Sequence, residues 1–364
     1  MRIHLTHPED LGAAELVRWR RLQQADRALA GPFFSPGYAQ AVAAARNDAR
    51  LLIIEDGGGI AGYFAAQRPS PFAAMPLGAP LTDVQGIVGA PSLAVRPADL
   101  CRALQVGRID FAGVLASQAA FAGHHQGVAG SWIAEVGGGS AAYLAGLRAR
   151  RNDTVRQQDK KRRKLAREHG EVVFSAMSRD RAHFEQVLAW KQAQSRRTNQ
   201  PPVWETPWVL KVVNEAWESA APDFAGALFT LTVGGRLVAG NFFLAGNGVL
   251  QDWIIAHDDA FNGYSPGIML ARATCEWAAD NGFHAVDFGP GDYQYKRQLT
   301  TTTRDLAWGF AARPSLAAAV RGAQYGLRGL MEAAPIGRWS DLPGKAMRRL
   351  DVRRAIGAPL AALL

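Results

Sequence analysis

Side chains that can move protons gather in the segment from Gln251 to Lys296. Asp252 is followed by three apolar residues at 253–255, and such surroundings raise a carboxyl pKa toward neutrality, where a general base works best. The other candidates are an imidazole, two carboxylates, a phenol and an ammonium group: His257, Asp287, Asp292, Tyr295 and Lys296. Two alternatives stay open, because His257 with Asp258 and Asp259 also fits a solvated strand end, and Asp287 also fits a strand cap.

A Ser-Pro-Gly turn follows Asp252 and His257 and precedes a helical pattern. Ser265 suits the N-cap, Pro266 suits the first helical position, and Gly267 lets a ligand approach the backbone. A helix begun this way presents its positive end to an anion such as a pyrophosphate. We therefore expect a phosphate-bearing donor at Tyr264, Ser265, Pro266, Gly267 and Ile268, although the same residues also make a simple helix start.

A second group combines aromatic and basic side chains: Trp190, Lys191, Gln194, Arg197 and Trp204. Aromatic faces pack against sugar rings, and cationic groups bind carboxylates or diphosphates. This group predicts binding of a sugar-bearing acceptor, for example a lipid-diphosphate-linked saccharide. The alternative places Trp190 in the core and the charged residues on a solvated face.

Composition indicates a folded, basic protein. The 364 residues are 48% hydrophobic and 20% charged, with a net charge of +9, so we expect two ordinary domains rather than disorder. Two cysteines, no secretory signal and no apolar run of spanning length predict a cytoplasmic protein, with peripheral contact at the inner membrane as an option. His124-His125 has no ligand partner at metal-binding spacing, and no Walker, dinucleotide-binding or Gly-x-Ser-x-Gly motif occurs, so no metal is expected.

The elements around these candidates show an internal repeat. Residues 51–66 and 229–244 align without gaps at an offset of 178, with Gly62 on Gly240 and Phe64 on Phe242. Each reads as a β-hairpin that follows a helix, at 35–46 and 208–219. The second copy continues as strand 171–176, helix 180–194, a helix from Thr206, the hairpin, strand 249–257, a helix after Ser265, strand 284–288, a short helix near Gln294 and strand 306–310. Chance similarity between hairpins is the alternative to duplication.

With this order, the segments FNGYSPGIML, VDFGPGDYQYK and WKQAQSRRTNQ resemble the GNAT-type acyltransferases of the CelD/BioF2-like group, which are related to the Fem peptidyltransferases. PFFSPGYAQAV and PLGAPLTDVQGIV fit the same pattern, and the resemblance covers roughly residues 15–312. It implies an α/β fold of two tandem GNAT-like modules with mixed sheets. The expected division is a non-catalytic module at 1–145, an acyltransferase module at 146–312 and a basic helical tail at 313–364.

The resemblance is greatest to proteins of exopolysaccharide and holdfast biosynthesis. It implies an N-acyltransferase that uses acetyl-CoA, or another acyl-CoA, on an amino sugar, with Tyr295 as acid for the departing thiolate and Lys296 bound to a phosphate or oxyanion. The usual pyrophosphate loop, Gln/Arg-x-x-Gly-x-Gly/Ala, is replaced by residues 262–267, Asn-Gly-Tyr-Ser-Pro-Gly. Aminoacyl-tRNA, the donor of Fem enzymes, is therefore an alternative.

The sequence also contains two basic stretches. Residues 148–167 predict one helix that joins the modules, either simply solvated or docked on an acidic membrane or RNA. The tail predicts helices at 317–331 and 345–355 and has two Arg-x-x-Asp pairs, Arg338 with Asp341 and Arg348 with Asp351. Such pairs can bind a guanine nucleotide, so a catalytically silent scaffold that responds to cyclic di-GMP is a third interpretation.

Overall fold

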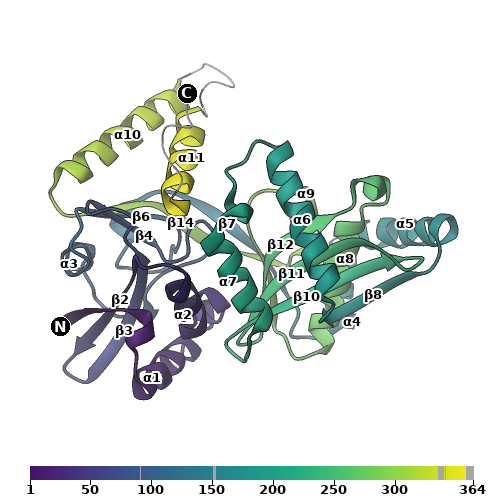
Figure 1. Ribbon diagram of the computed structural model, residues 1–364, viewed down its shortest axis with the longest axis horizontal. Helices are drawn as coiled ribbons and strands as arrows, with labels where there is room; N and C mark the ends of the chain where they lie inside the picture. Colours follow the sequence, from purple (N-terminus) through teal and green to yellow (C-terminus); the bar gives the residue numbers. More distant parts are fainter. Residues whose placement is uncertain (91, 151–152, 335–339, 341, 358–364) are drawn as a thin grey trace.

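One continuous mixed β-sheet runs through the molecule and carries helices on both faces (Figure 1). The structure is a computed structural model that describes residues 1–364 except 91, 151–152, 335–339, 341 and 358–364. Within this part of the chain the sheet has 14 strands, in the order β1-β2-β3-β4-β6-β14-β7-β13-β12-β11-β10-β8, with β5 beside β3 and β9 beside β10. The mixed sheet between helical layers confirms the predicted α/β class.

The first part of the chain forms one end of this sheet. Its strands are β1 (Arg2–Thr6), β2 (Ala49–Asp56), β3 (Gly59–Gln67), β4 (Ala73–Pro76), β5 (Val88–Gly89), β6 (Arg108–Leu115) and β7 (His125–Glu135). Its helices are α1 (Ala13–Gln24), α2 (Pro36–Ala45) and α3 (Pro97–Ala103), with short 3-10 turns at Pro8–Asp10, Arg27–Leu29, Pro32–Phe34 and Ala122–His124.

The second part forms the other end and the C-terminal helices. Its strands are β8 (Val172–Ser178), β9 (Ala220–Ala221), β10 (Phe224–Val233), β11 (Arg236–Gly246), β12 (Val249–His257), β13 (Ala285–Pro290) and β14 (Thr302–Ala312). Its helices are α4 (Ser140–Ala149), α5 (Thr154–His169), α6 (Arg181–Arg197), α7 (Pro207–Glu218), α8 (Pro266–Asp280), α9 (Gln294–Leu299), α10 (Leu316–Ala333) and α11 (Leu342–Ile356), with 3-10 turns at Val203–Glu205 and η6 (Asp259–Tyr264).

Both predicted hairpins are present. β2 pairs antiparallel with β3, and β10 pairs antiparallel with β11. Each ladder has a β-bulge near its turn, after Ile54 in the first hairpin and after Leu231 in the second. At the offset of 178 Ile54 corresponds to Thr232, so the two bulges differ in position by one residue, and the pairing of the hairpins is similar but not identical.

The two ends of the sheet are interwoven by β7 and β14. β14, from late in the chain, lies between β6 and β7, whereas β7, from the first part, pairs with β13. The chain therefore crosses the middle of the sheet in both directions. The expected boundaries at 145 and 312 remain a prediction, and the strands near both of them take part in this exchange.

The predicted joining helix over 148–167 is wrong in one respect. α4 ends at Ala149, and a separate helix, α5, begins at Thr154. α4 and α8 pack together, and α5 lies against the turn η6 that leads into α8. The basic run is therefore part of the second half of the fold and contacts its predicted donor turn.

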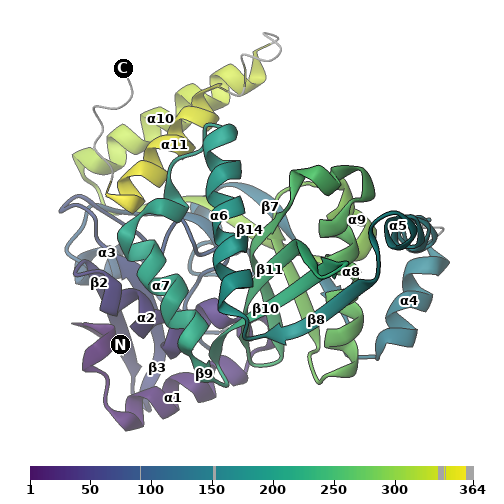
Figure 2. The ribbon, with the colours of Figure 1, turned by 45° about the vertical axis from the view of Figure 1, so that its right-hand side comes forward.

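Three apolar clusters hold the layers together. One joins α2, α6 and α7 to a face of β11 and β12, and the second joins α4 and α8 to the opposite face. The third packs α3 onto β2, β3 and β6. Figure 2 shows α6 crossing in front of β10 and β11. In the described part of the chain, no helix has the length and hydropathy that crossing a bilayer requires.

Candidate functional site

Strands β12 and β13 pair for only three residues and then diverge. Their parallel ladder joins 249–251 to 285–287. Beyond Gln251, β12 continues to His257 beside β11, while β13 bends away and pairs Pro290 with Ser131 of β7. Beyond residues 251 and 287 the two strands no longer pair with each other, and the start of α8 lies beside the end of β12, where a Cβ added to Gly267 would be 3.7 Å from His257.

Five ionisable residues interact where the strands separate, and each comes from a different element. They are Asp83 from the segment between β4 and β5, Lys191 from α6, Asp252 from β12, Asp287 from β13 and Lys296 from α9. We call these five residues the charged cluster. Asp83 lies directly over the β13 backbone, since a Cβ added to Gly289 would be 2.7 Å from its Oδ2. The cluster thus joins both parts of the chain.

Asp287 is fixed by donors on every side. The Ser131 hydroxyl and the Gly289 amide each donate to its Oδ1 at 2.8 Å, and Arg304 pairs with its other oxygen. This side chain is almost fully buried. Through these contacts Asp287 holds β7, β13 and β14 together.

Lys296 holds the loop that follows β13. Its Nζ donates to the carbonyl oxygens of Phe288 at 2.6 Å, Pro290 at 2.8 Å and Gly289 at 3.3 Å. Burial lowers the pKa of this ammonium, while Asp252, Asp83 and Asp287 act in the opposite direction. With its three hydrogens used on backbone carbonyls, Lys296 positions the glycine-rich loop and supplies positive charge to the cluster.

Asp83 and Asp252 are the carboxyl groups whose protonation is tuned. Burial, followed by the negative charge of Asp287, raises the pKa of Asp83 to about 7, against the opposing effect of Lys296. Burial likewise raises the pKa of Asp252, while Lys296 lowers it, as predicted from its apolar neighbours. A carboxyl group that titrates near pH 7 can both accept and return a proton in one reaction cycle. Asp83 is therefore a strong candidate for a general base, and it is absent from the residues predicted from sequence.

A cavity of about 590 Å³ extends from Asp83 to the C-terminal helices. Its walls come from residues 75–85, from β6 and β14, from the loop at 290–293 and from α10 and α11. Aromatic rings line it, with Trp308 stacked on Tyr325 at 5.8 Å between ring centroids and Arg328 placed 3.9 Å over the Trp308 ring. Arg321 and Arg348 add positive charge. The tail that begins at Arg313 thus completes a wall of this cavity.

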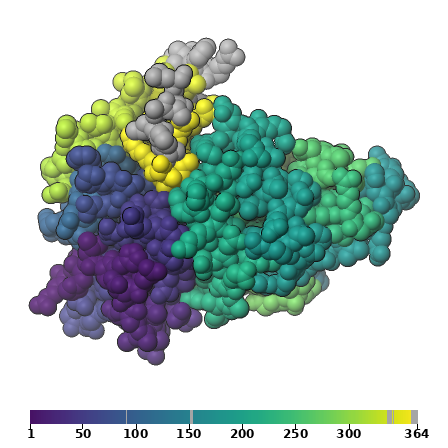
Figure 3. Space-filling view, viewed as in Figure 1, coloured from purple at the N-terminus to yellow at the C-terminus, as the bar shows by residue number. Residues whose placement is uncertain are grey.

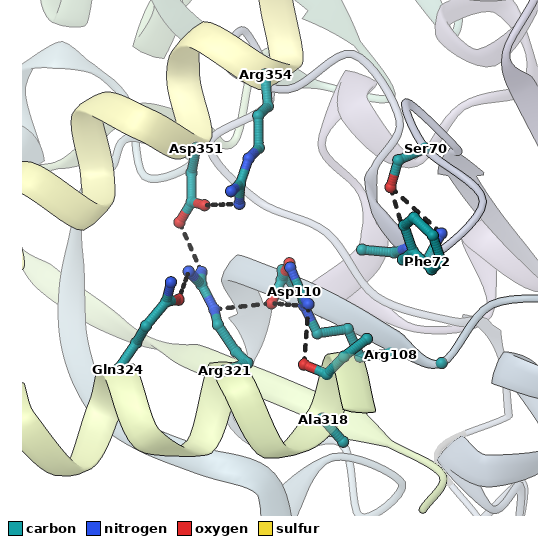
Figure 4. A network of polar contacts seen from close by, with 12 residues as sticks. Ser70, Phe72, Arg108, Asp110, Ala318, Arg321, Gln324, Asp351 and Arg354 are labelled. Atoms are coloured by element: carbon teal, nitrogen blue, oxygen red, sulfur yellow. Dashed lines mark hydrogen bonds and ion pairs between the residues drawn. The ribbon is translucent and has the colours of Figure 1, made fainter. Parts of the chain in front are cut away.

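An ion-pair network fixes the tail in that position (Figure 4). Arg321 of α10 pairs with Asp110 of β6 at 2.9 Å and with Asp351 of α11 at 2.6 Å. Arg108 also binds Asp110, at 3.0 Å, and Arg354 approaches Asp351 at 3.8 Å. Of the predicted nucleotide-binding residues, Asp351 is thus held by protein arginines, and Arg348 lines the cavity. Arg338 and Asp341 lie outside the described residues, so nucleotide binding stays a prediction.

The predicted donor turn has the expected helix but not the expected cap. Pro266 opens α8, yet Ser265 adopts a left-handed conformation (φ 56°, ψ 53°) and makes no capping hydrogen bond. Its hydroxyl instead accepts a hydrogen bond from Lys161 Nζ of α5 at 2.7 Å. A Cβ added to Gly267 would be in ordinary contact with His257 at 3.7 Å and Ile255 at 3.8 Å, so the helix start packs beside the end of β12. Ser265 occupies the predicted N-cap position, but a lysine contacts its hydroxyl in place of a capping hydrogen bond.

Helix α5 also fixes the neighbouring Tyr264. The Tyr264 hydroxyl donates to Glu168 and lies 3.0 Å from His169 Nε2, and Lys164 sits 5.5 Å over its ring. Ile268 packs against the apolar cluster on the α8 side of the sheet. The five predicted donor residues thus lie together. The sequence predicted the basic helix itself, but only the three-dimensional structure shows that it contacts these residues.

The remaining predicted proton-transfer residues lie in different surroundings from one another. Asp292 is exposed and bonded to Arg297, a contact that lowers its pKa, so it is poorly suited to act as a base. His257 Nε2 lies 2.5 Å from Asn262 Oδ1 at the end of β12. Tyr295 packs edge-on against Phe288 at 6.2 Å between centroids, and burial raises its pKa. Tyr295 therefore keeps its proton and is available as a donor near Asp252.

The five residues of the predicted acceptor group do not all lie together in the structure. Lys191 belongs to the charged cluster, where burial lowers its pKa. Trp190 and Trp204 are half-buried against the core, with Trp204 6.4 Å from Trp253. Gln194 and Arg197 are exposed, and Arg197 pairs with Asp259 at 2.9 Å. Among the described residues no group of three histidine, cysteine or acidic side chains has the arrangement of a metal site.

The family comparison agrees with this geometry. Residues 153–297 match the model of the acetyltransferase (GNAT) domain, a span that contains β12, β13, the donor turn and four of the five cluster residues. This match supports an acyltransferase, with residues 153–297 as the part that is similar to the GNAT domain. A comparison with curated protein sequences finds no significant match.

Solved structures share the fold across most of the chain. FemX superposes with a TM-score of 0.54 at 10% identity, covering 85% of this chain and 96% of FemX. The C-terminal domain of a candidate lysylphosphatidylglycerol synthetase from Agrobacterium fabrum gives 0.52 at 11% identity, covering 85% and 95%. A protein of unknown function from Bacteroides thetaiotaomicron gives 0.53 at 10% identity, covering 84% and 100%. At these identities the similarity concerns the fold alone.

Proposed function

We propose that this protein is an N-acyltransferase that moves an acetyl group, or another short acyl group, from an acyl-CoA thioester to the amine of an amino sugar. The reaction would belong to bacterial exopolysaccharide, holdfast or envelope biosynthesis. The observation that carries the proposal is the position of the charged cluster: it lies where β12, which leads toward α8, diverges from β13, and its Asp83 borders the cavity of about 590 Å³. A donor at the start of α8 and an acceptor in the cavity would meet at a titratable carboxyl group.

The donor side has the features that a phosphate-bearing thioester needs. The start of α8 lies with its positive end beside the end of β12, and Lys161 Nζ lies 2.7 Å from the Ser265 hydroxyl. Asp252 of the charged cluster lies on the same strand, at a position where β12 no longer pairs with β13. An acyl-CoA bound with its phosphates at the turn would direct its thioester along this strand.

The acceptor side suits a ring that carries a negative charge. Trp308, Tyr325 and Phe111 supply aromatic surfaces, and Arg348 supplies a cation for a phosphate or carboxylate. A cavity of this volume accommodates a sugar with a charged substituent. Its contact with Asp83 would bring an amino group on that sugar to the base.

The chemistry then follows from the tuned pKa values. Asp83 takes a proton from the acceptor ammonium, and the free amine attacks the thioester carbonyl carbon, forming the C–N bond as the carbonyl π electrons move to oxygen. Lys191 stabilises this oxyanion electrostatically. When the carbonyl re-forms, the C–S bond breaks, the thiolate takes a proton from Tyr295, and the new ammonium nitrogen loses its extra proton to Asp252. Solvent restores these protonation states between turnovers.

Release of free thiol from acetyl-CoA tests the proposal, with glucosamine and its UDP-linked and lipid-diphosphate-linked forms as acceptors. We expect amine-dependent thiol release and a product heavier by one acetyl group. If no amine raises thiol release above hydrolysis while acetyl-CoA binds normally, amino-sugar acylation is wrong. Asp99→Asn, in a carboxylate held by Arg96 and Arg102 on the surface, is a matched control that should retain full activity.

A Fem-like transfer from aminoacyl-tRNA is the second candidate. It is favoured by α5, whose exposed Lys160, Arg163 and Arg167 lie on the same helix as the Lys161 that contacts the donor turn. Thermal-shift measurements with acetyl-CoA and with charged tRNA separate the two donors, because only the true donor should stabilise the protein at concentrations near its Kd.

A further inference from the structure

Helix α10 carries an apolar face that no other described element covers. Its exposed positions are all apolar or glycine except Glu332, and the larger ones recur at spacings of three and four residues: Leu316, Val320, Ala323, Leu327 and Leu330. Leu316 is 81% exposed and Leu330 is 74% exposed. A continuous apolar stripe of this length on the surface marks a docking site, because scattered apolar residues would not share one helix face.

Positive charge surrounds this face. Residues 313–364 contain nine basic and three acidic residues, a net +6 out of the chain's +9. Arg313, Lys345, Arg348 and Arg349 are exposed. The charged side chains of α10 that point inward are already used, since Arg321 binds Asp110 and Asp351, and Arg328 binds Glu332. The tail therefore combines an exposed apolar helix face on α10 with exposed basic side chains at Arg313 and on α11.

We propose that the apolar face of α10 docks on an anionic membrane surface. Helices that lie in the plane of a bilayer combine an apolar face with flanking basic residues, and each basic residue near anionic lipid adds to the binding. The spacing of the stripe would also fit a second copy of this helix. The charges decide between the two, because pairing two tails of net +6 is opposed electrostatically, whereas an anionic bilayer attracts them.

Docking in this way places the cavity at the membrane. α10 and α11 lie side by side over the first part of the sheet (Figures 1 and 3), and the same two helices wall the cavity that reaches Asp83. If the proposed function holds, this arrangement favours an acceptor that is anchored in the membrane, with its sugar in the cavity and its lipid in the bilayer. This step rests on the proposed function. The membrane interaction itself does not depend on catalysis, so it can be tested without turnover.

Co-sedimentation of the full chain with vesicles tests the docking. Vesicles of phosphatidylcholine with phosphatidylglycerol should bind the protein, and vesicles of phosphatidylcholine alone should bind it at least about tenfold more weakly. The double substitution Leu327→Ser with Leu330→Ser should weaken binding to the anionic vesicles by roughly a hundredfold, since each buried leucine contributes about tenfold. Arg349→Glu should weaken it roughly tenfold.

A matched double substitution on another surface is the control. Val173→Ser with Met177→Ser removes two exposed apolar residues from β8, the strand at the far end of the sheet, and should leave vesicle binding unchanged. Thiol release with a water-soluble amine should be equal in all these variants, so that loss of docking is distinguished from loss of the proposed activity.

Three results would overturn the proposal. The first is vesicle binding that does not change with Leu327→Ser and Leu330→Ser. The second is a dimer in solution that this double substitution dissociates, which would assign the face to a second copy. The third is a chain ending at Gly357 that binds vesicles much more tightly than the full chain, which would show that residues 358–364 occupy the face.

Discussion

Replacing Asp83 by asparagine removes the titrating carboxyl group and keeps its size. Because burial and the charge of Asp287 raise its pKa from 3.8 to about 7, the wild-type kcat/KM should rise with pH through this value as the base form appears. Asp83→Asn should lower kcat by about 10² to 10⁴, the usual contribution of a general base, and abolish the rise near pH 7. Binding of acetyl-CoA, measured by calorimetry, should stay within threefold because Asp83 lies on the acceptor side.

The same substitution makes a prediction about stability. A carboxyl group whose folded pKa exceeds its unfolded pKa destabilises the fold once pH rises above the unfolded value, and the full cost is reached above the folded value. Asp83→Asn should therefore equal the wild type in unfolding free energy near pH 4 and exceed it by up to about 4 kcal/mol at pH 8. A variant with kcat within threefold of wild type and an unchanged pH profile would refute the assignment of Asp83 as base.

Further substitutions test other parts of the site. Tyr295→Phe should lower kcat about a hundredfold with little change in KM, measured by thiol release, and a loss under threefold would exclude Tyr295 as the acid. Lys161→Met should weaken acetyl-CoA binding about tenfold in calorimetry, and unchanged binding would remove the donor site from the α8 turn. Gly289→Ala should lower both activity and Tm because its Cβ would meet Asp83 Oδ2. Gly291→Ala, also at positive φ, should lower the free energy of unfolding by about 1–2 kcal/mol and retain more activity than Gly289→Ala; equal activities would contradict this. Arg321→Met should leave Asp110 and Asp351 without their shared partner, so proteolysis of the tail should become at least tenfold faster, and an unchanged rate would show that the network does not fix α10.

The local elements of the second part could be predicted because their patterns are strong. β12 spans the predicted residues without error, and α7, α8 and α9 begin where proline, turn residues and apolar spacing indicate. The sequence did not predict that the Ser265 hydroxyl accepts a hydrogen bond from Lys161, which lies on a helix about a hundred residues earlier. The residues around Ser265 in the sequence give no indication of such a long-range contact.

The long-range arrangement could not be predicted for the same reason. Nothing near β14 indicates that it inserts between β6 and β7, since strand pairing between distant segments depends on the whole sheet. Asp83 carries no motif of its own, and its raised pKa arises from Asp287 and burial, both supplied by the folded chain. Asp292, by contrast, lies in the predicted catalytic loop, yet the fold turns it outward to Arg297. Sequence thus identified the segments of the site, while tertiary packing decided which side chains face it.

A crystal structure with bound acetyl-CoA shows directly where the donor lies. We predict the pyrophosphate at the backbone amides of Gly267 and Ile268, the thioester between β12 and β13, and the acetyl carbonyl carbon within reach of an amine that is hydrogen-bonded to Asp83. Acetyl-CoA bound elsewhere, with its thioester far from Asp83 and Asp252, would contradict the proposed function.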